Sequence, residues 1–257
     1  MKKIVILGGG ESGTGSAVLA RKQGFDTFLS DSGTIKPAYR EILEKNNISF
    51  EEGKHSEEII FSADEVIKSP GIPEKNPLIK SLHEKGIPVI SEIEFAGRFT
   101  DAPKICITGS NGKTTTTTLI WHMLKKAGIN AALTGNVGNS FAMAVAEGGY
   151  ECYVLELSSF QLDGMSEFKA ETAILLNITP DHLDRYNYQM QNYVDSKLRI
   201  IQNQGSADNF IYWADDPVIM REIEKRNPVS RMLPFSATKT EGMAAWVEND
   251  EIFINLK

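Results

Sequence analysis

The chain has little cysteine, no long apolar run and no block of like charges. Its two cysteines, Cys106 and Cys152, both lie inside apolar runs typical of strands. Two such isolated thiols argue against a disulfide framework or a cysteine-based metal site, so we expect core thiols in a reducing compartment. No apolar run is long enough to cross a membrane, and the N-terminus has no signal-type segment. These absences predict a cytoplasmic protein without a membrane partner.

The charge of the chain is moderately acidic. Its 27 basic and 34 acidic residues give a formal net charge of −7, and the basic ones form no long run. This balance argues against a nucleic-acid groove but is compatible with a small anionic substrate, which a few local groups can hold. At 257 residues, 41% of them apolar, the chain is long for one domain and can fill two cores.

Strand-like and helix-like segments alternate along the chain, which is typical of parallel sheets with helices on both faces. A polar segment that contains Pro103 separates two cycles of this pattern. We therefore predict an α/β fold, with a Rossmann-like domain at 1–98 and a second parallel-sheet domain at 99–257. In the first domain, strands are expected at 4–7, 26–29, 65–68 and 88–90, with helices at 16–22, 37–45 and 76–85. In the second, strands are expected at 104–107, 130–133, 151–156, 172–176 and 209–213, helices at 113–127, 189–203 and 216–225, and a hairpin at 244–255.

The first glycine-rich turn, Gly8–Gly13, fits the pattern G-x-G-x-x-G directly after a strand. Asp31 follows 23 positions after Gly8, at the end of the second strand. This context is typical of dinucleotide sites, where the glycines let the backbone approach a pyrophosphate and the acid meets a ribose hydroxyl. Another diphosphate ligand, or a tight turn with no ligand, explains the glycines as well. The turn at Ser69–Pro73 follows the third strand, where open α/β sheets bind ligands, although ordinary turn chemistry also accounts for it.

The second glycine-rich segment, Thr108–Thr115, has the sequence Thr-Gly-Ser-Asn-Gly-Lys-Thr-Thr. It resembles a phosphate-binding loop, in which backbone N–H groups face the anion, a lysine reaches the outer phosphates and a hydroxyl ligates Mg²⁺. The strict pattern requires glycine five residues before Gly112, where Ile107 stands. A simple strand–helix connection therefore remains an alternative. The residues that would bind ATP are Gly109, Ser110, Asn111, Gly112, Lys113, Thr114 and Thr115.

Three further side chains are candidates for the chemistry around this loop. Glu156 ends an apolar strand, where a carboxylate commonly holds Mg²⁺, although it could be an exposed strand-end acid. His182 follows the next strand and could bind metal or substrate, or belong to a helix start at Thr179-Pro180-Asp181. Lys197 lies on the apolar face of a helix, where lysine usually extends to solvent but can also be a reactive buried amine.

Together these segments resemble the Mur ligases of peptidoglycan synthesis. Leu-Ser-Ser-Phe-Gln-Leu followed by Asp-His-Leu-Asp-Arg-Tyr is more specific than either glycine motif. This pair favours the members that add D-glutamate to UDP-N-acetylmuramoyl-L-alanine. The stretches that carry the resemblance are Gly8–Gly13, Ser69–Ile72, Thr108–Thr115, Gly135–Gly138, Leu155–Leu162, and Asn177–Tyr186 with Lys197.

The resemblance implies a role for each candidate. The N-terminal domain would hold uridine diphosphate instead of NAD, through Glu11, Ser12, Asp31, Ser32, Ser69 and Gly71. The second domain would bind ATP, because this family uses a shorter loop that does not require glycine at position 107. Asn136 and His182 would contact the muramoyl substrate. The ligands of two Mg²⁺ ions would come from Thr114, Glu156, His182 and Lys197, with Lys197 carbamylated by CO₂. The catalytic residues would be Lys113, His182 and Lys197.

The reaction implied is ATP-driven amide formation through an acyl phosphate, carried out by a monomer on D-glutamate. The family has a third, C-terminal domain that binds the incoming amino acid and has no counterpart in these residues, so we expect binding without ligation. Alternatives are a sister Mur ligase, a folylpolyglutamate synthase-like ligase or an NAD-binding Rossmann protein. The last explains residues 1–31 but leaves Lys113, Glu156, His182 and Lys197 unconnected.

Overall fold

The computed structural model describes residues 1–256 and divides them into two compact units. Unit 1 contains Met1–Asp101 together with two later segments, Thr134–Gly149 and Phe160–Phe168. Unit 2 contains the rest of the chain from Ala102 onward. The sequence analysis divided the chain once, after residue 98, and so placed these two later segments in the second domain. The structure assigns them to unit 1.

Unit 1 is built on a five-stranded parallel sheet with the order β3-β2-β1-β4-β5. The central strand β1 is apolar throughout Ile4–Leu7, and all four of these residues are fully buried. A parallel strand covered on both faces has no solvent side, which explains a continuous apolar run in place of alternation. The strands are β1 (Lys3–Leu7), β2 (Asp26–Asp31), β3 (Ser49–Glu52), β4 (Glu65–Lys68) and β5 (Val89–Ser91).

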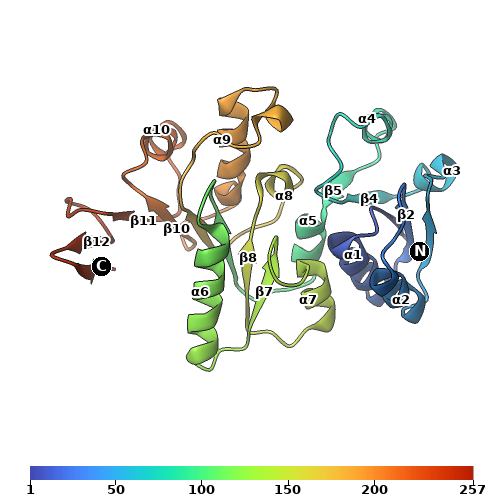
Figure 1. Cartoon of the computed structure of the whole chain (residues 1–257), viewed down its shortest axis with the longest axis horizontal. Helices are drawn as coiled ribbons and strands as arrows, with labels where there is room; N and C mark the ends of the chain where they lie inside the picture. The colour runs from blue at the N-terminus through green and yellow to red at the C-terminus, as the bar shows by residue number, and fades with distance from the viewer. Residues whose placement is uncertain (257) are drawn as a thin grey trace. The chain divides into compact units, whose positions relative to one another are not determined.

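Seven helices accompany this sheet in the described part of unit 1, and Figure 1 shows α1 and α2 side by side in blue. The sequence determines where several of them begin. Asn76 caps α4 by accepting the N–H of Leu78 at 2.9 Å, and Pro77 occupies the first helical position, where no N–H is needed. The helices are α1 (Glu11–Lys22), α2 (Pro37–Lys45), α3 (Glu57–Ile60), α4 (Pro77–Glu84), α5 (Glu92–Gly97), α7 (Phe141–Glu147) and α8 (Ser159–Asp163), whose first residue belongs to unit 2.

Two buried acids on α5 attach the later segments to unit 1. The Glu94 carboxylate accepts three backbone N–H groups, from Ser166, Glu167 and Phe168, at 2.8–3.0 Å. Glu92 accepts the N–H of Ala142, at the start of α7, at 2.8 Å. Buried carboxylates are tolerated when hydrogen bonds replace the water that they lose. These contacts explain why segments far apart in the sequence belong to one unit.

Unit 2 is built on an eight-stranded sheet with the order β13-β12-β11-β10-β9-β6-β8-β7. Strands β6, β8, β9, β10, β11 and β12 pair in parallel, and the hairpin β12–β13 is antiparallel. Strand β7 ends in the segment that belongs to unit 1. The strands are β6 (Lys104–Thr108), β7 (Ala131–Gly135), β8 (Cys152–Glu156), β9 (Thr172–Leu175), β10 (Asn209–Trp213), β11 (Arg231–Ser236), β12 (Ala245–Glu248) and β13 (Glu251–Ile254).

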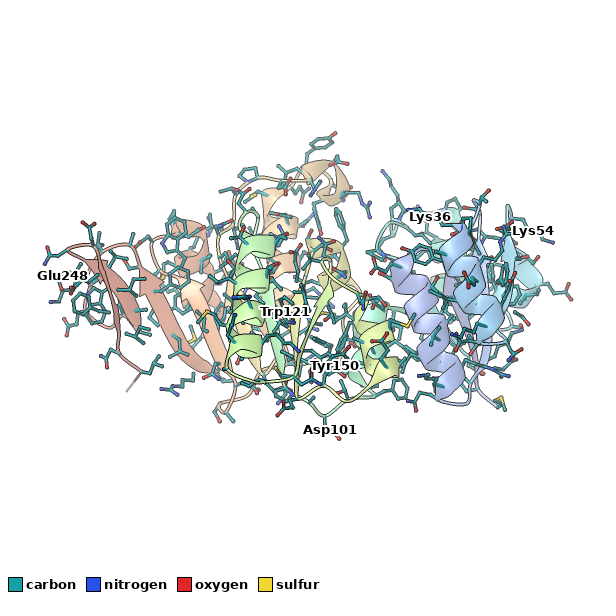
Figure 2. All side chains as sticks on the ribbon, turned by 60° about the horizontal axis from the view of Figure 1, so that its bottom comes forward. Lys36, Lys54, Asp101, Trp121, Tyr150 and Glu248 are labelled. Carbon is teal, nitrogen blue, oxygen red and sulfur yellow. The ribbon has the colours of Figure 1, made fainter. Side chains whose placement is uncertain are left out.

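Helix α6 (Lys113–Lys126) runs alongside β8 in Figure 1 and carries Trp121, which is labelled in Figure 2. The Trp121 indole donates its N–H to the Ala131 carbonyl at 3.0 Å, so its polar end is satisfied while the ring packs on the sheet. The other helices of unit 2 are α9 (Met190–Leu198), α10 (Pro217–Arg226) and the 3₁₀ turns η1 (Leu183–Tyr186) and η2 (Arg199–Ile201).

The structure confirms the predicted α/β class and parallel pairing and adds elements that the sequence analysis missed. The predicted helix 189–203 is divided into α9 and the 3₁₀ turn η2. Cys106 and Cys152 are free and buried, as predicted, and burial raises the pKa of both thiols. None of the described helices is long and apolar enough to cross a membrane. The missed elements are β3, β11, α3, α5, α7 and α8.

Because α1 packs closely on α7, we predict that a larger residue at Gly15 destabilises unit 1. A Cβ at Gly15 would lie 2.0 Å from Ser140 Oγ and 3.0 Å from the Met143 backbone nitrogen. Ser140 Oγ caps α7, so it cannot rotate away without losing that bond. We expect Gly15→Ala to lower the free energy of unfolding by about 1–3 kcal/mol in urea titrations, more than alanine gains from helix propensity.

Gly71→Ala is the matched control for Gly15→Ala. No heavy atom lies within 4 Å of a Cβ at Gly71, and its φ is not positive. Its free energy of unfolding should stay within about 0.5 kcal/mol of wild type. Equal stability of the two variants would contradict the packing account.

Candidate functional site

The phosphate-type loop of unit 2 joins β6 to α6 and is held from the next strand. Gly109 and Gly112 have φ of +153° and +83°, values that favour glycine. The Ser110 N–H donates to the Asn177 carbonyl at 3.0 Å, and the Asn111 N–H donates to Asn177 Oδ1 at 2.8 Å. Asn177 follows β9, the strand beside β6. The loop is therefore fixed by its neighbour in the sheet.

Ser110 is the most connected residue of this loop. Its Oγ donates to the Thr179 carbonyl at 2.8 Å and accepts the Thr179 N–H at 2.9 Å. The Tyr193 hydroxyl lies 3.0 Å from the same oxygen, on its remaining acceptor side. A serine hydroxyl has one donor and two acceptor positions, so this set satisfies it completely. The loop cannot move without breaking these bonds.

Tyr193 is a residue of this site that the sequence analysis did not single out. Its side chain is almost fully buried, and burial raises the pKa of its hydroxyl. It lies four residues before Lys197 on α9, so the two share one helix face. This spacing is the feature of the sequence that could have identified Tyr193 as a site residue. Its hydrogen-bond partner Ser110 lies 83 residues away in the chain, so no local pattern reveals the contact.

Two lysines converge on one backbone carbonyl of the loop. Lys113 Nζ donates to the Gly109 carbonyl at 2.9 Å and to the Ser110 carbonyl at 2.8 Å. Lys197 Nζ donates to the same Gly109 carbonyl at 2.8 Å and lies 4.7 Å from the centre of the Tyr193 ring. Lys197 is only 1% exposed, so it does not extend to solvent as lysines usually do. Two cations beside the N-terminus of α6 suit an anionic ligand.

Glu156 ends β8, the strand on the other side of β6. It is 1% exposed and is paired in register with Ile107, just before the loop. Strand β6 also contacts Leu157, the residue that follows Glu156, because Thr108 Oγ1 donates to the Leu157 carbonyl at 2.8 Å. Thr114 and Thr115 are exposed in the first turn of α6. Carboxylate and hydroxyl oxygens are ligand types that suit a hard cation such as Mg²⁺.

The described residues do not contain a complete metal cluster of their own. Among residues 1–256, no group of three His, Cys, Asp or Glu side chains is placed to hold a metal ion. A cation bound by Glu156 and the Thr114 hydroxyl would therefore need ligand oxygens as well, which is usual for Mg²⁺ at nucleotide sites. The donor types present fit such a shared site.

His182 lies in an exposed segment after β9. Its side chain is 59% exposed and its Nε2 lies 3.6 Å from Asp181 Oδ2. Its φ of +49° is in the left-handed region, and η1 begins at the next residue. The helix start considered at Thr179-Pro180-Asp181 is not formed. Asp216 fixes this segment instead, because its carboxylate accepts the Ile178 N–H at 2.8 Å while also capping α10.

In unit 1, three segments meet around the first glycine-rich turn. Asp31 accepts the Gly9 N–H at 2.5 Å through Oδ2 and the Gly33 N–H at 2.7 Å through Oδ1. A Cβ at Gly8 would lie 2.4 Å from Ser69 Oγ, so the Ser69 turn approaches the glycine turn closely. The Asp31 carboxylate thus organises the turn. The other candidates of unit 1 lie at its surface or first helical turn: Glu11, Ser32, Gly71 and Asn136 are exposed, and Ser12 is half-buried.

Two sequence profiles cover most of the chain. The Mur ligase middle domain matches residues 107–253, and the MurD-like N-terminal domain of Mur ligases matches residues 2–91. The chain therefore belongs to the Mur ligase family, as its motifs predicted. The two matches fall on the two glycine-rich turns and the strands that hold them.

Curated relatives with the same name are similar along almost the whole chain. UDP-N-acetylmuramoylalanine–D-glutamate ligase of Bacteroides fragilis is 60% identical over 254 residues, which are 99% of this chain and 57% of that protein. The protein of that name from Porphyromonas gingivalis strain W83 is 53% identical over 98% of the chain and 57% of its own length. The chain thus spans a little over half the length of these relatives.

Solved structures show the same fold at low sequence identity. UDP-N-acetylmuramate:L-alanyl-gamma-D-glutamyl-meso-diaminopimelate ligase from Neisseria meningitidis has a TM-score of 0.66 at 18% identity, covering 94% of this chain and 82% of that one. UDP-N-acetylmuramate-alanine ligase from Thermotoga maritima has a TM-score of 0.58 at 22% identity, covering 96% and 55%. These likenesses support the fold alone.

From the hydrogen bond between Tyr193 and Ser110 we predict how a substitution at Tyr193 changes the affinity of the loop for nucleotide. Tyr193→Phe removes the hydroxyl that holds Ser110, which costs about 1 kcal/mol, or roughly fivefold in affinity if the loop binds nucleotide. We expect this loss in titrations with a fluorescent ATP analogue and Mg²⁺.

Tyr186→Phe is the matched control. Tyr186 is also buried, its ring lies 5.5 Å from that of Tyr193, and its hydroxyl is 3.2 Å from Ser196 Oγ instead of the loop. It should change stability about as much but leave the nucleotide affinity unchanged. Equal loss of affinity in both variants would show that the effect is general loosening.

Proposed function

We propose that this chain is part of a Mur ligase that uses ATP to join D-glutamate to UDP-N-acetylmuramoyl-L-alanine, in the cytoplasm. The observation that carries the proposal is the convergence of Lys113 and Lys197 on the Gly109 carbonyl, with the buried Glu156 paired in register with Ile107 just before the loop. The names of the relatives, at 53–60% identity along the chain, support the choice of amino acid and sugar nucleotide.

ATP is the phosphoryl donor in the proposed reaction, and the loop supplies its binding groups. The N–H groups at the start of α6 would face the phosphates, and the Lys113 ammonium would leave its carbonyl partners to meet the outer ones. Mg²⁺ would be held by the Thr114 hydroxyl and the Glu156 carboxylate, and it would neutralise charge on the phosphates. Fixed positive groups account for most of the catalysis in such transfers.

The substrate carboxylate would attack the γ-phosphorus to give an acyl phosphate and ADP. The amine of D-glutamate would then attack the acyl carbon, releasing phosphate and forming the amide. His182 is proposed to contact the muramoyl substrate from its exposed loop, and Asn136 likewise from unit 1. The 257 residues are proposed to bind the two nucleotides, while ligation would require the remaining length that the relatives have.

Lys197 is proposed to react with CO₂ and to provide a second Mg²⁺ with an anionic ligand. An amine attacks CO₂ only in its neutral form, and burial favours that form of a lysine. The observation that supports this proposal is the burial of the Lys197 side chain, which is 1% exposed.

Unit 1 is proposed to hold the uridine diphosphate. Its glycine turn, the start of α1 and the Ser69 turn lie at the carboxyl edge of the parallel strands, where open α/β sheets bind ligands. Glu11, Ser12, Asp31, Ser32, Ser69 and Gly71 are the proposed contacts. All of these proposed contacts come from one chain, so we propose that the protein acts as a monomer.

Thermal unfolding of this chain with candidate ligands tests the proposal. A ligand at about a hundred times its Kd adds about 2.7 kcal/mol, or roughly 5–10 °C for a chain of this size. We expect such a shift with UDP-N-acetylmuramoyl-L-alanine, and none with NAD⁺ at the same concentration.

Lys113→Ala should keep the shift with the UDP compound and lose any shift with MgATP, because Lys113 belongs to unit 2. A shift with NAD⁺ alone would contradict the assignment of unit 1. Loss of both shifts in Lys113→Ala would contradict the separation of the two sites.

A further inference from the structure

Asp216 is a buried carboxylate whose two oxygens bind different parts of unit 2. It is 5% exposed and comes directly before α10, with Pro217 in the first helical position. Its Oδ1 caps that helix by accepting the N–H groups of Val218 and Ile219 at 2.9 and 3.1 Å. Its Oδ2 accepts, at 2.8 Å, the N–H of Ile178 in the segment after β9. A helix cap needs only one oxygen, which serine also supplies, so the second oxygen serves a different contact.

Ile178 is the middle residue of the segment that holds the loop between β6 and α6, here called the nucleotide loop. On one side of it, Asn177 accepts the Ser110 N–H through its carbonyl and the Asn111 N–H through its side chain, at 3.0 and 2.8 Å. On the other side, Thr179 exchanges two hydrogen bonds with the Ser110 hydroxyl, at 2.8 and 2.9 Å. The segment is thus bonded to the nucleotide loop at its two ends and to the cap of α10 at its middle.

The sheet of unit 2 brings these three parts together at one edge. Strands β10, β9 and β6 are consecutive in the sheet and pair in parallel, so their carboxyl ends lie at the same edge. Asp216 follows β10, Ile178 follows β9, and the nucleotide loop follows β6. A displacement at Asp216 therefore reaches the nucleotide loop through one intervening segment.

We propose that Asp216 is a positioning residue for the nucleotide loop, because it keeps the segment Asn177–Thr179 where that segment fixes the loop for a phosphate ligand. This inference rests on the proposed ATP site of unit 2. Without the Oδ2 acceptor, the N–H of Ile178 is left buried and unpaired, since Ile178 is only 3% exposed. The segment relieves this cost by moving toward water, and it takes the loop residues bonded to it along. The loop then has its binding shape in a smaller fraction of the molecules, and the nucleotide affinity falls by that fraction.

Helix α10 has further attachments that do not involve its cap residue. The Gln191 side chain on α9 donates to Glu222 at 3.3 Å, and Arg226 forms an ion pair with Asp195 of α9. In Asp216→Ser, the hydroxyl still accepts an N–H at the start of α10, but a single shorter oxygen cannot also reach the segment after β9. This substitution therefore removes the support of the nucleotide loop while α10 keeps its cap and its contacts with α9.

Calorimetric titration of this chain with MgATP tests the inference. We expect Asp216→Ser to bind MgATP about five- to tenfold more weakly than wild type, because the loss of a buried hydrogen bond is passed on to the loop. Its affinity for UDP-N-acetylmuramoyl-L-alanine should not change, because that ligand is proposed for unit 1 and Asp216 belongs to unit 2. Thermal unfolding identifies the temperature at which both proteins are folded for the titration.

Asp216→Asn replaces Asp216→Ser in this titration if the serine variant does not fold. It keeps the size of the side chain but has one acceptor oxygen, which asparagine at an N-cap gives to the helix. The same loss of MgATP affinity is expected.

Asp215→Ser is the matched control. Asp215 also follows β10 and accepts three hydrogen bonds, at 2.7–3.0 Å, from Trp213, Ser236 and Ala237. Ser236 ends β11 and Ala237 follows it, on the other side of β10 from β9. Asp215→Ser should therefore bind MgATP as tightly as wild type.

Asn177→Ala adds a measurement that a purely structural role of Asp216 would not change. It removes the side chain that accepts the Asn111 N–H and donates to the Asn111 carbonyl, so the segment already holds the loop less firmly. If Asp216 acts through this segment, Asp216→Ser should lower the MgATP affinity by a smaller factor in the Asn177→Ala background than in wild type.

Three results would overturn the positioning role and leave the ATP site intact. They are equal affinity for MgATP in Asp216→Ser and wild type, an equal loss in Asp215→Ser, and the same factor lost in both backgrounds. Absence of MgATP binding by wild type would instead overturn the proposed ATP site, and the role of Asp216 with it.

Discussion

The Gly109 carbonyl is the point on which the unit 2 site depends. Lys113 and Lys197 both donate to it. The position of this carbonyl depends on the turn of the loop, in which Gly109 and Gly112 have positive φ. The loop keeps that shape because Asn177, Thr179 and the Tyr193 hydroxyl bond to it from neighbouring elements. Because these bonds hold the backbone of the loop in place, its N–H groups are already positioned for an anion, which suits phosphoryl transfer.

Buried acids play the corresponding part in unit 1. Glu92 and Glu94 replace lost water with backbone N–H groups from segments that come 50 and 72–74 positions later in the chain. Each carboxylate therefore fixes a distant segment at the expense of its own desolvation. Burial raises the pKa of Glu92 to about 7, and the hydrogen bonds that Glu92 accepts only partly oppose this.

The glycine turns, the parallel strands and the family could be predicted because each depends on local chemistry. Strand β3 was missed because its sequence, Ser-Phe-Glu-Glu, has little apolar character, and β11 because it contains Pro234. The attachment of 134–149 and 160–168 to unit 1 depends on long-range bonds that no local pattern reveals. Tyr193 was missed for the same reason, whereas the burial of Lys197 agrees with its place on an apolar helix face.

The account depends most directly on Lys197 belonging to the ligand site and not only to the core. Lys197→Met keeps the length and burial of the side chain but removes the group that contacts Gly109. Calorimetric titration with MgATP, beside thermal unfolding of both proteins, separates the two roles. The account predicts an affinity at least about tenfold weaker at nearly unchanged stability, a loss of about 1.4 kcal/mol or more. Unchanged affinity for MgATP would contradict it.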